Sequence, residues 1–429
     1  MEWLKDIATV CQYVGVALSV LTAYEVVFFA VGIFFRKRFK KTEERRRYAL
    51  CVPARNEEKV IQNFLESVAN SDYPLEKLTV FIVADNCTDQ TAQISRSYRN
   101  KRLRVIVYEH NAADERTKGY ALRYLFEKIE KDYGVENFDG YFIFDADNVI
   151  SANYITKMNE AFVAGNKIVT SFRNSKNLNR NWISFGYGMH WMRTCLYENR
   201  AKSLLGLACR IQGTGFLFSN ELVRQGWKYT SLTEDRSFCS DAVVQGYKIC
   251  YCDEAVFYDE QPYRLKIAVR QRIRWAKGHL GSTVENCPKL LKNMFIKRKN
   301  FLMTYDCFWL NFPSTVERAV RKIIRLGIQI TLAVLAYNLF GWLKGAFWMY
   351  VGDVFGKWLG YMAYQICILI VYRKRIEKGN GLKRFFHMAL FPLFDVIGRL
   401  ATYIALFTKV EWKMIPHETV MDVSQLNNV

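Results

Sequence analysis

A long apolar run near the start of the chain limits what this protein can fold into. Residues Val10 to Phe35 are almost continuously hydrophobic, and Glu25 is the only charged residue among them. At about 1.5 Å per residue, a helix of this length crosses a hydrocarbon core of about 30 Å. A cleavable signal peptide is the alternative, but the run is longer than such signals and no A-x-A cleavage site follows it. We therefore expect a membrane-spanning helix.

A cluster of basic residues follows this run directly. Arg36-Lys37-Arg38 begins the cluster, and Lys40, Lys41 and Arg45-Arg46-Arg47 continue it, in a chain whose net charge is +20. An excess of Lys and Arg beside a span marks its cytoplasmic end. RNA binding is the alternative for such a cluster, but topology and anionic lipid explain it better beside a membrane span. We expect a lipid bilayer as partner and no nucleic acid.

The last third of the chain repeats this pattern. Two apolar stretches, Leu326 to Leu343 and Val354 to Tyr372, are joined by a short segment that carries Lys344 and Asp353. A second basic cluster, within residues 373–384, then predicts another return to the cytoplasm. The eleven cysteines include no C-x-x-C pair and the five histidines are widely spaced, which argues against a zinc site or a disulfide framework.

Two further segments are expected to lie on the membrane surface. Phe385 to Phe407 is apolar but contains Pro392, Asp395 and Arg399, so we interpret it as an interfacial helix, with a true span as the alternative. Residues 296–322, in which Phe308, Trp309 and Phe312 alternate with Arg318, Arg321 and Lys322, suit another interfacial helix. The predicted organisation is an N-terminal span and basic anchor at 1–44, a cytosolic domain at 45–295 and a membrane region at 296–429. It describes a multi-pass protein of the plasma (inner) membrane.

Strands and helices alternate along the predicted cytosolic domain. Expected strands are Tyr48–Val52, Leu78–Ala84, Leu103–Tyr108 and Tyr141–Phe144, and expected helices are Glu57–Asn70, 90–98 and Gly119–Lys131. This order predicts βαβ units and a mostly parallel α/β sheet, in which ligands bind at the carboxyl ends of the strands. The chain has neither G-x-G-x-x-G nor G-x-x-x-x-G-K-[ST], which argues against a dehydrogenase and a P-loop NTPase.

Asp145 and Asp147 follow the predicted strand Tyr141–Phe144. Two carboxylates at this spacing can hold one hard divalent cation, Mg²⁺ or Mn²⁺, that bridges diphosphate oxygens. A solvated turn or a helix cap is the common alternative for an isolated D-x-D. The buried strand before it and its place in a βαβ domain favour the metal site.

Thr233-Glu234-Asp235 is the second acidic motif. A Thr before two acids is also a common helix N-terminus, worth about 1 kcal/mol, and both interpretations can hold together. If Asp235 faces a pocket that contains a metal-bound diphosphate, it can act as a general base. A sugar hydroxyl is a poor nucleophile near neutral pH, so proton removal during its attack matters.

The third motif is Gln271-Arg272-Ile273-Arg274-Trp275, within a basic helix expected from about Arg264 to His279. Arg274 can neutralise charge on a leaving diphosphate, and Trp275 can offer a flat apolar face to a sugar ring. A positively charged amphipathic helix on the membrane, with Trp275 as its interfacial anchor, is the alternative.

Together these motifs resemble the membrane-integrated processive family 2 glycosyltransferases, which include cellulose, chitin, poly-N-acetylglucosamine and hyaluronan synthases. The resemblance covers residues 48–280 and depends on four motifs in fixed order: Val52-Pro53-Ala54-Arg55-Asn56-Glu57, Asp85…Asp89 with Asp145-Ala146-Asp147, Thr233-Glu234-Asp235, and Q-x-x-R-W at 271–275. It implies a GT-A (nucleotide-diphospho-sugar transferase, Rossmann-like) domain flanked by transmembrane and interfacial helices. The implied chemistry is an inverting displacement that converts a UDP-sugar into a β-linked product.

The same resemblance assigns roles to particular residues. Donor-binding residues would be Pro53, Glu57, Asp85, Lys118, Asp145, Gln271 and Arg274. Asp147 with Asp145 would hold the metal ion. Asp235, within Thr233-Glu234-Asp235, would deprotonate the acceptor. The loop Gln212-Gly213-Thr214-Gly215 and Trp275 would bind the acceptor. Trp412-Lys413-Met414-Ile415-Pro416-His417 resembles the cytoplasmic tail of these synthases, which favours an interfacial Phe385 to Phe407.

The expected function is a processive β-glycan synthase that extends a growing glycan and secretes it. Thr-Glu-Asp resembles cellulose synthases more than the Gly-Asp-Asp of hyaluronan synthases, so we favour UDP-glucose and a cellulose-like or mixed-linkage β-glucan. UDP-GlcNAc remains open as donor, as does one-step transfer onto a lipid carrier. A transporter or scaffold whose carboxylates only cap helices is the non-enzymatic alternative. No cyclic-dinucleotide domain or gating loop follows Trp275, and a homo-oligomer or accessory subunit could complete a channel.

Overall fold

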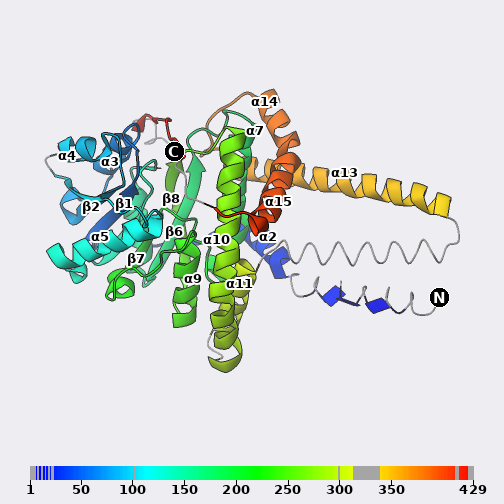
Figure 1. Cartoon of the computed structure of the whole chain (residues 1–429), viewed down its shortest axis with the longest axis horizontal. Helices are drawn as coiled ribbons and strands as arrows, with labels where there is room; N and C mark the ends of the chain where they lie inside the picture. Colours follow the sequence, from blue (N-terminus) through cyan, green and yellow to red (C-terminus); the bar gives the residue numbers. More distant parts are fainter. Residues whose placement is uncertain are drawn as a thin grey trace.

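The computed structural model describes residues 24–100, 102–297, 300–312, 339–410 and 415–423, together with scattered positions before residue 24. Its centre is a sheet of eight described strands in the order β3-β2-β1-β4-β7-β6-β8-β5 (Figure 1). The strands are β1 (Tyr48–Ala54), β2 (Leu78–Asp85), β3 (Arg104–His110), β4 (Gly140–Ile143), β5 (Val149–Ile150), β6 (Ile168–Ser175), β7 (Phe216–Ser219) and β8 (Ile249–Asp259).

The two halves of the sheet differ in strand direction. Strands β3, β2, β1 and β4 are parallel neighbours, as the alternating pattern predicts. Strand β7 then runs antiparallel to both β4 and β6, while β8 is parallel to β6 and antiparallel to β5. The sheet is therefore mixed, and its parallel half brings the ends of β1, β2 and β4 to one edge.

Helices cover both faces of the parallel half. They are α3 (Ile61–Ala69), α4 (Thr91–Ser97), α5 (Lys118–Tyr133) and α6 (Tyr154–Val163). Side chains alternate along β1, so that Ala49 and Cys51 share a buried cluster with helix α5, whereas Leu50 and Val52 share one with helices α3 and α6. This period of two explains why the strand is apolar at nearly every position.

The helix expected from Glu57 begins four residues later, at Ile61. The N–H of Glu57 donates to Thr91 Oγ1 at 2.8 Å, and the N–H of Glu58 donates to Asp89 Oδ2 at 3.1 Å. Asn56 has a φ of 57°, which turns the chain after β1. These hydrogen bonds hold residues 57–60 in a turn, and the side chain of Glu57 reaches a cavity.

The second half of the sheet domain is built around a long helix. Helix α10 (Leu265–Lys292) contains the basic helix expected from Arg264 to His279 and continues past it. The other elements are α7 (Trp182–Arg193), the π-helical turn η3 (Thr194–Asn199), α8 (Arg200–Leu205), α9 (Glu234–Gln245), α11 (Phe301–Asn311) and the short turns η1 (Leu75–Lys77), η2 (Val135–Asn137), η4 (Asn220–Val223) and η5 (Asn293–Lys297).

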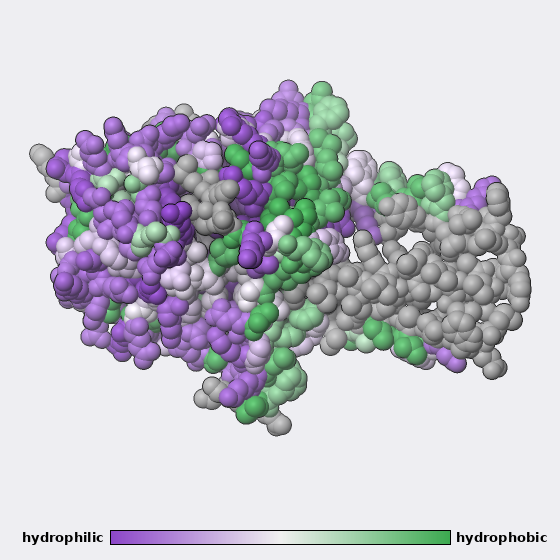
Figure 2. Space-filling model, viewed as in Figure 1, coloured by the Kyte–Doolittle hydropathy of each residue, from purple (hydrophilic) through white to green (hydrophobic). Residues whose placement is uncertain are grey.

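Apolar helices lie on one side of this domain. They are α2 (Tyr24–Phe34), α13 (Leu339–Val371), α14 (Gly381–Ala389) and α15 (Phe391–Phe407). Val354–Val371 and Gly381–Phe407 are long and apolar enough to cross a membrane by length and composition. Helix α13 points away from the sheet, and hydrophobic surface covers α14 and α15 while the sheet domain is mostly hydrophilic (Figures 1 and 2).

Two predictions for the apolar region need correction. The segment with Lys344 and Asp353, expected to join two stretches, is part of the continuous helix α13. Phe385 to Phe407 is not one helix, because the chain breaks at Leu390 between α14 and α15. Arg272 and Lys277 of α10 donate to the carbonyls of Phe394 and Ala405, at 2.7 and 3.1 Å, which holds α15 on the sheet domain. Three predicted segments lie partly outside the continuously described residues. They are the start of Val10 to Phe35, most of Leu326 to Leu343 and, within 296–322, residues 313–322.

Candidate active site

One cavity of about 1000 Å³ starts at the carboxyl ends of β1, β2 and β4 and continues among the helices. Asp147, Asp235 and Trp275, which lie far apart in the sequence, all line it. The other predicted site residues that line it are Pro53, Glu57, Asp85, Lys118, Asp145, Gly213, Thr233, Glu234, Gln271 and Arg274. The carboxylates and the Arg–Trp pair thus meet around a single space.

Asp85 ends β2 at the outer edge of the cavity. Its carboxylate contacts the guanidinium of Arg55, and the Nδ1 atom of His110 lies 2.9 Å from its Oδ1 atom. Asp89, four residues later, accepts the backbone N–H groups of Glu58 and Thr91 at 3.1 and 3.0 Å. Asp85 therefore fixes polar groups beside the cavity, while Asp89 holds the turn behind it.

Lys118 stands at the start of α5 and connects three parts of the site. Its Nζ atom contacts the carboxylate of Asp145, donates to the carbonyl of Gly213 at 2.8 Å and lies 3.9 Å from Glu234. Burial alone would lower the pKa of Lys118, but Asp145 and Glu234 raise it. Burial raises the pKa of Glu234 to about 7, against the opposing effect of Lys118. Lys118 is thus a stable positive charge among carboxylates.

Asp147 is the more deeply buried member of the D-x-D pair. Its Oδ2 atom accepts the N–H of Glu260 at 2.9 Å, and its Oδ1 atom accepts the Asn148 amide at 3.2 Å. Burial would raise the pKa of Asp147, yet nearby His417 and Lys176 lower it. The carboxylate is therefore ionised at neutral pH, as a ligand for a cation must be.

The donor set fits a hard divalent cation. Among the described residues, each Asp147 oxygen accepts one hydrogen bond, and a carboxylate oxygen can accept two, so both keep capacity to bind. Within the described ranges, no three His, Cys, Asp or Glu side chains form a preformed cage. Mg²⁺ and Mn²⁺ do not need such a cage when they keep waters and bind substrate phosphates through one or two carboxylates.

The loop at 212–215 supports the D-x-D turn from behind. Gly213 and Gly215 have φ values of 82° and 64°, and a Cβ on Gly215 would come 2.3 Å from the ring of Phe257. Thr214 Oγ1 accepts the N–H of Asp145 at 2.8 Å. Gln212 and Gly213 line the cavity, whereas Thr214 and Gly215 stand behind it and shape the loop.

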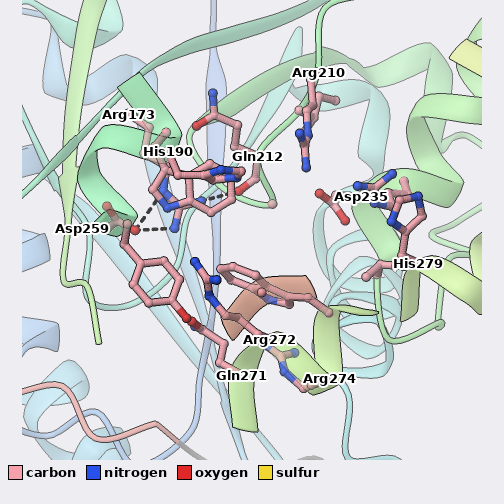
Figure 3. A pocket seen from close by; sticks show the side chains of 18 of the residues that line it. Arg173, His190, Arg210, Gln212, Asp235, Asp259, Gln271, Arg272, Arg274 and His279 are labelled. Carbon is pink, nitrogen blue, oxygen red and sulfur yellow. Dashed lines mark hydrogen bonds and ion pairs between the residues drawn. The ribbon is translucent and has the colours of Figure 1, made fainter. Parts of the chain in front are cut away.

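Thr233 occupies the N-cap position of α9, but its side chain makes no capping hydrogen bond. Its hydroxyl is buried without a hydrogen-bond partner among the described residues. Asp235 follows in the first helical turn and lines the cavity near Arg210 and His279 (Figure 3). The motif starts a helix, as the structural alternative proposes, and also places a carboxylate at the cavity.

Gln271, Arg274 and Trp275 share one face of α10 because they are three and four residues apart. Burial lowers the pKa of Arg274, opposed by Glu234 and Asp145. Trp275 stands edge-on to the rings of Tyr187 and Trp191, with centroid distances of 5.9 and 5.6 Å. This helix face is turned toward the cavity rather than toward a membrane.

Part of the cavity wall comes from the far end of the sequence. His417 Nδ1 lies 3.0 Å from both carboxylate oxygens of Glu57, and Glu260 accepts the N–H groups of Glu418 and Thr419, each at 2.7 Å. Burial raises the pKa of Glu57 to about 7, while Asp147 and Glu57 raise that of His417 to about 10 against the effect of burial. The sequence marked 412–417 as a tail motif, but it gave no sign that His417 reaches the cavity.

Sequence reasoning also missed the buried ion pair of Arg173 and Asp259. Arg173 Nε donates to Asp259 Oδ2 at 2.9 Å, and its guanidinium lies 4.0 Å from the ring centroid of Trp191 (Figure 3). Asp259 ends β8 and Arg173 lies in β6, so the pair joins neighbouring strands next to Asp147. The sequence signal for Asp259 is an acidic residue at the end of an apolar strand, as after β1 and β4.

The mixed sheet has a D-x-D turn after β4, and the carboxylate of Asp235 lines the same cavity as this turn. This arrangement defines a GT-A nucleotide-sugar transferase fold. The family model described as "Glycosyltransferase like family 2" matches residues 45–278, more than half of the chain. The chain therefore belongs to glycosyltransferase family 2 and is an enzyme of glycosyl transfer.

Relatives and solved structures agree with this assignment. The chain is 23% identical to "Probable glycosyltransferase YdaM" of Bacillus subtilis, over 68% of this chain and 66% of the relative. It is 22% identical to "Hyaluronan synthase" of Streptococcus pyogenes, over 66% of this chain and 68% of the relative. It is 23% identical to "Beta-monoglucosyldiacylglycerol synthase" of a Nostoc strain, over 59% of this chain and 53% of the relative. The chain thus spans between half and two thirds of most of these relatives.

A solved structure shares the fold over nearly the whole chain. It is the mannosyltransferase PcManGT of Pyrobaculum calidifontis, in complex with GDP-Man and Mn²⁺. The TM-score is 0.56 at 16% identity, covering 92% of this chain and 99% of that one. At this identity the likeness establishes the fold alone.

Proposed function

We propose that this enzyme transfers a hexose from a UDP-sugar, most readily UDP-glucose, onto an acceptor hydroxyl and so extends a β-linked polysaccharide. The observation that carries the proposal is that Asp147, Asp235 and Trp275 line one cavity at the edge of the sheet. These are the groups that an inverting transfer needs: a site for the diphosphate, a base and an acceptor platform.

The donor end would bind the nucleotide diphosphate. Asp147 and Asp145 would hold Mg²⁺ or Mn²⁺, which would offset negative charge on the leaving diphosphate when bound. Lys118 and Arg274 line the same end as fixed positive charges. Pro53, Glu57 and Asp85 border the place where the base and ribose would lie.

Asp235 is the proposed general base. As the acceptor oxygen forms its bond to the anomeric carbon, Asp235 takes the hydroxyl proton and the bond from that carbon to the UDP oxygen breaks. Attack opposite the leaving group converts an α-linked donor into a β-linked product. Gly213, whose added Cβ would lie 3.9 Å from Asp235 Oδ2, leaves room for the acceptor beside the base.

The acceptor decides which product forms. Trp275 at the cavity wall supports a sugar chain that moves forward after each transfer. One-step transfer onto a lipid is the second candidate, and the apolar helices α2 and α11 beside the cavity favour it. UDP-GlcNAc remains the alternative donor, since one acetamide group depends on pocket shape rather than on these motifs.

The proposed location is the inner membrane, with the sheet domain in the cytosol. The two candidate spans and the exposed apolar side chains of α13 and α15 support this placement. Translocation of the product, and a homo-oligomer or accessory subunit that completes a channel, are parts of the same proposal.

Membranes that contain the protein test the proposal directly. They are incubated with Mn²⁺ and radiolabelled UDP-glucose, UDP-GlcNAc or GDP-mannose, and the products are separated by size and lipid solubility. A high-molecular-weight product that a β-glucanase digests supports the main proposal. Label confined to a short lipid-soluble product would rule out processive synthesis. No UDP release with any UDP-sugar would rule out the donor class.

A further inference from the structure

Three arginines line the cavity together with Asp235, and we call them the arginine cluster: Arg193, Arg210 and Arg236. Glu198 of the π-helical turn lies 3.5 Å from Arg193 and 3.9 Å from Arg210, so one carboxylate serves two guanidinium groups. Arg236 donates to the carbonyl of Leu310 at 2.8 Å.

The nearby charges balance Arg193, whose pKa Glu198 and Asp395 raise against the effect of burial, but they do not balance Arg236. Lys202 and Asp306 form their own pair, at 2.8 Å. Besides Glu198, two carboxylates act on the cluster: Asp395 on Arg193, and Asp235, the proposed base, on Arg236. Positive charge enclosed by protein is costly unless an anion or hydrogen-bond acceptors compensate it.

The pKa values of His279 and Arg236 are consistent with positively charged surroundings. Burial together with Arg236 and Arg210 lowers the pKa of His279 to about 3, so this side chain is neutral at physiological pH. Burial and Arg210 lower the pKa of Arg236 to about 10. The indole N–H of Trp309, also at the cavity wall, is buried without an acceptor among the described residues. A buried donor that lacks an acceptor among the described residues, close to several arginines, suits an anionic ligand.

Apolar helices adjoin this end of the cavity. Phe28 and Phe29 of α2, and Trp309 and Phe312 beside or within α11, line it together with the arginine cluster. Other side chains of these helices are exposed and apolar, as with Val27 and Leu302, which are 51% and 70% exposed. A ligand that lies here therefore meets cations at one end and a lipid-facing surface at the other.

We propose that the arginine cluster binds the phosphate group of an amphiphilic acceptor, whose hydrocarbon chain lies along α2 and α11. This inference rests on the proposed function and concerns the lipid that receives the first sugar, whether or not the product is then extended. Guanidinium groups suit a phosphate because each offers two parallel N–H donors. In the proposed function the diphosphate of the donor is bound by other residues of the cavity, namely Asp145, Asp147, Lys118 and Arg274.

Binding of farnesyl phosphate to the purified full chain in neutral detergent tests the proposal without requiring turnover. Farnesol and inorganic phosphate are the comparison ligands, and short-chain phosphatidic acid distinguishes a glyceride phosphate from an isoprenoid phosphate. We expect farnesyl phosphate to bind at least ten-fold more tightly than farnesol or inorganic phosphate. Arg210→Gln with Arg236→Gln should remove that preference, whereas Arg224→Gln, a change at an exposed arginine paired with Glu136, should keep it.

The affinity for UDP with Mn²⁺ is measured on the same samples. Unchanged UDP binding alongside weakened farnesyl phosphate binding supports the proposal. Equal affinity for farnesol, equal affinity for inorganic phosphate, or a loss confined to UDP would overturn it. If the double variant does not fold, inhibition of the wild-type enzyme decides: farnesyl phosphate should not compete with the UDP-sugar, and competition would contradict a separate site. Absence of UDP binding in the wild type would instead defeat the proposed function.

Discussion

The two ends of the cavity are built in different ways. The donor end gathers residues from the ends of β1, β2, β4 and β8, which one sheet edge brings together. The acceptor end, by which we mean the part of the cavity around Trp275 and the arginine cluster where we propose that the acceptor binds, gathers residues from helices α2, α7, α10, α11, α13 and α15. Residues that follow neighbouring strands lie at one sheet edge, so short motifs predict their position. Residues in a space between helices are positioned by helix packing, which short motifs do not predict.

The ends also differ in charge. The donor end pairs carboxylates with cations: Asp147, Glu57 and Glu260 surround His417, and Lys118 contacts Asp145. Arginines dominate the acceptor end, where burial and two of them keep His279 neutral. Carboxylates suit a cation that accompanies a diphosphate, and a basic end suits an anionic or strongly polar acceptor. Asp235 lies between them, where transfer would occur.

The largest expected effect is on turnover and follows from a change at Asp235. Asp235→Asn should reduce kcat by about 100-fold or more, because the acceptor hydroxyl loses its base, while UDP binding is retained. Turnover is measured as UDP release, and binding by calorimetry. Asp241→Asn is the matched control on the same helix, since Asp241 pairs with Tyr229 and Lys228 instead of lining the cavity. Near-normal turnover of Asp235→Asn would remove this residue from the base role.

The donor end is tested by Asp147→Asn. Loss of the carboxylate should weaken Mn²⁺-dependent binding of the UDP-sugar by about 10- to 100-fold, since an amide lacks the charge that a hard cation prefers. Calorimetry with and without Mn²⁺ measures the change. Asp132→Asn, at a carboxylate that accepts from Tyr108 Oη at the far side of the domain, controls for charge alone. Equal metal dependence in the variant and the wild type would place the cation elsewhere.

His417→Gln tests whether the tail belongs to the donor end. Loss of the charged contact with Glu57 should speed amide exchange in residues 415–423 by about 10- to 100-fold, because hydrogen bonds to charged groups contribute about 1.5–3 kcal/mol. Hydrogen–deuterium exchange measures it. Lys59→Gln removes an exposed 3.5 Å pair with Glu418 and should change little. Unchanged exchange in His417→Gln would mean that packing alone holds the tail.

The smallest effect concerns His279 and pH. Its pKa is lowered from 6.5 to about 3 by burial and two arginines, so the folded state resists the proton that the unfolded chain accepts. Its contribution to stability is therefore complete above pH 6.5 and is lost as the pH falls toward 3, by at most about 1.4 kcal/mol per pH unit. His279→Gln should show a smaller fall in Tm between pH 6.5 and 5. Parallel curves would show that His279 already binds a proton in the fold.

Much of the donor end could be predicted from the sequence. Apolar runs ending in acids locate β1, β2 and β4, and the motifs at 145–147, 233–235 and 271–275 all reach the cavity. The sequence could not show that His417 pairs with Glu57, because a contact across 360 positions leaves no local pattern. The arginine cluster was missed for a related reason: arginines in a basic chain are common, and only the fold shows which of them share a carboxylate.

The segment that contacts Glu57 and Glu260 follows α13, α14 and α15 in the chain. During synthesis, the eight described strands and the carboxylates after them leave the ribosome before these helices, and the segment with His417 emerges after them. The cavity therefore gains the wall formed by His417 after the apolar helices have been made. Because His417 follows α13, α14 and α15 in the chain, the cavity is completed only after these candidate anchor helices have been synthesised.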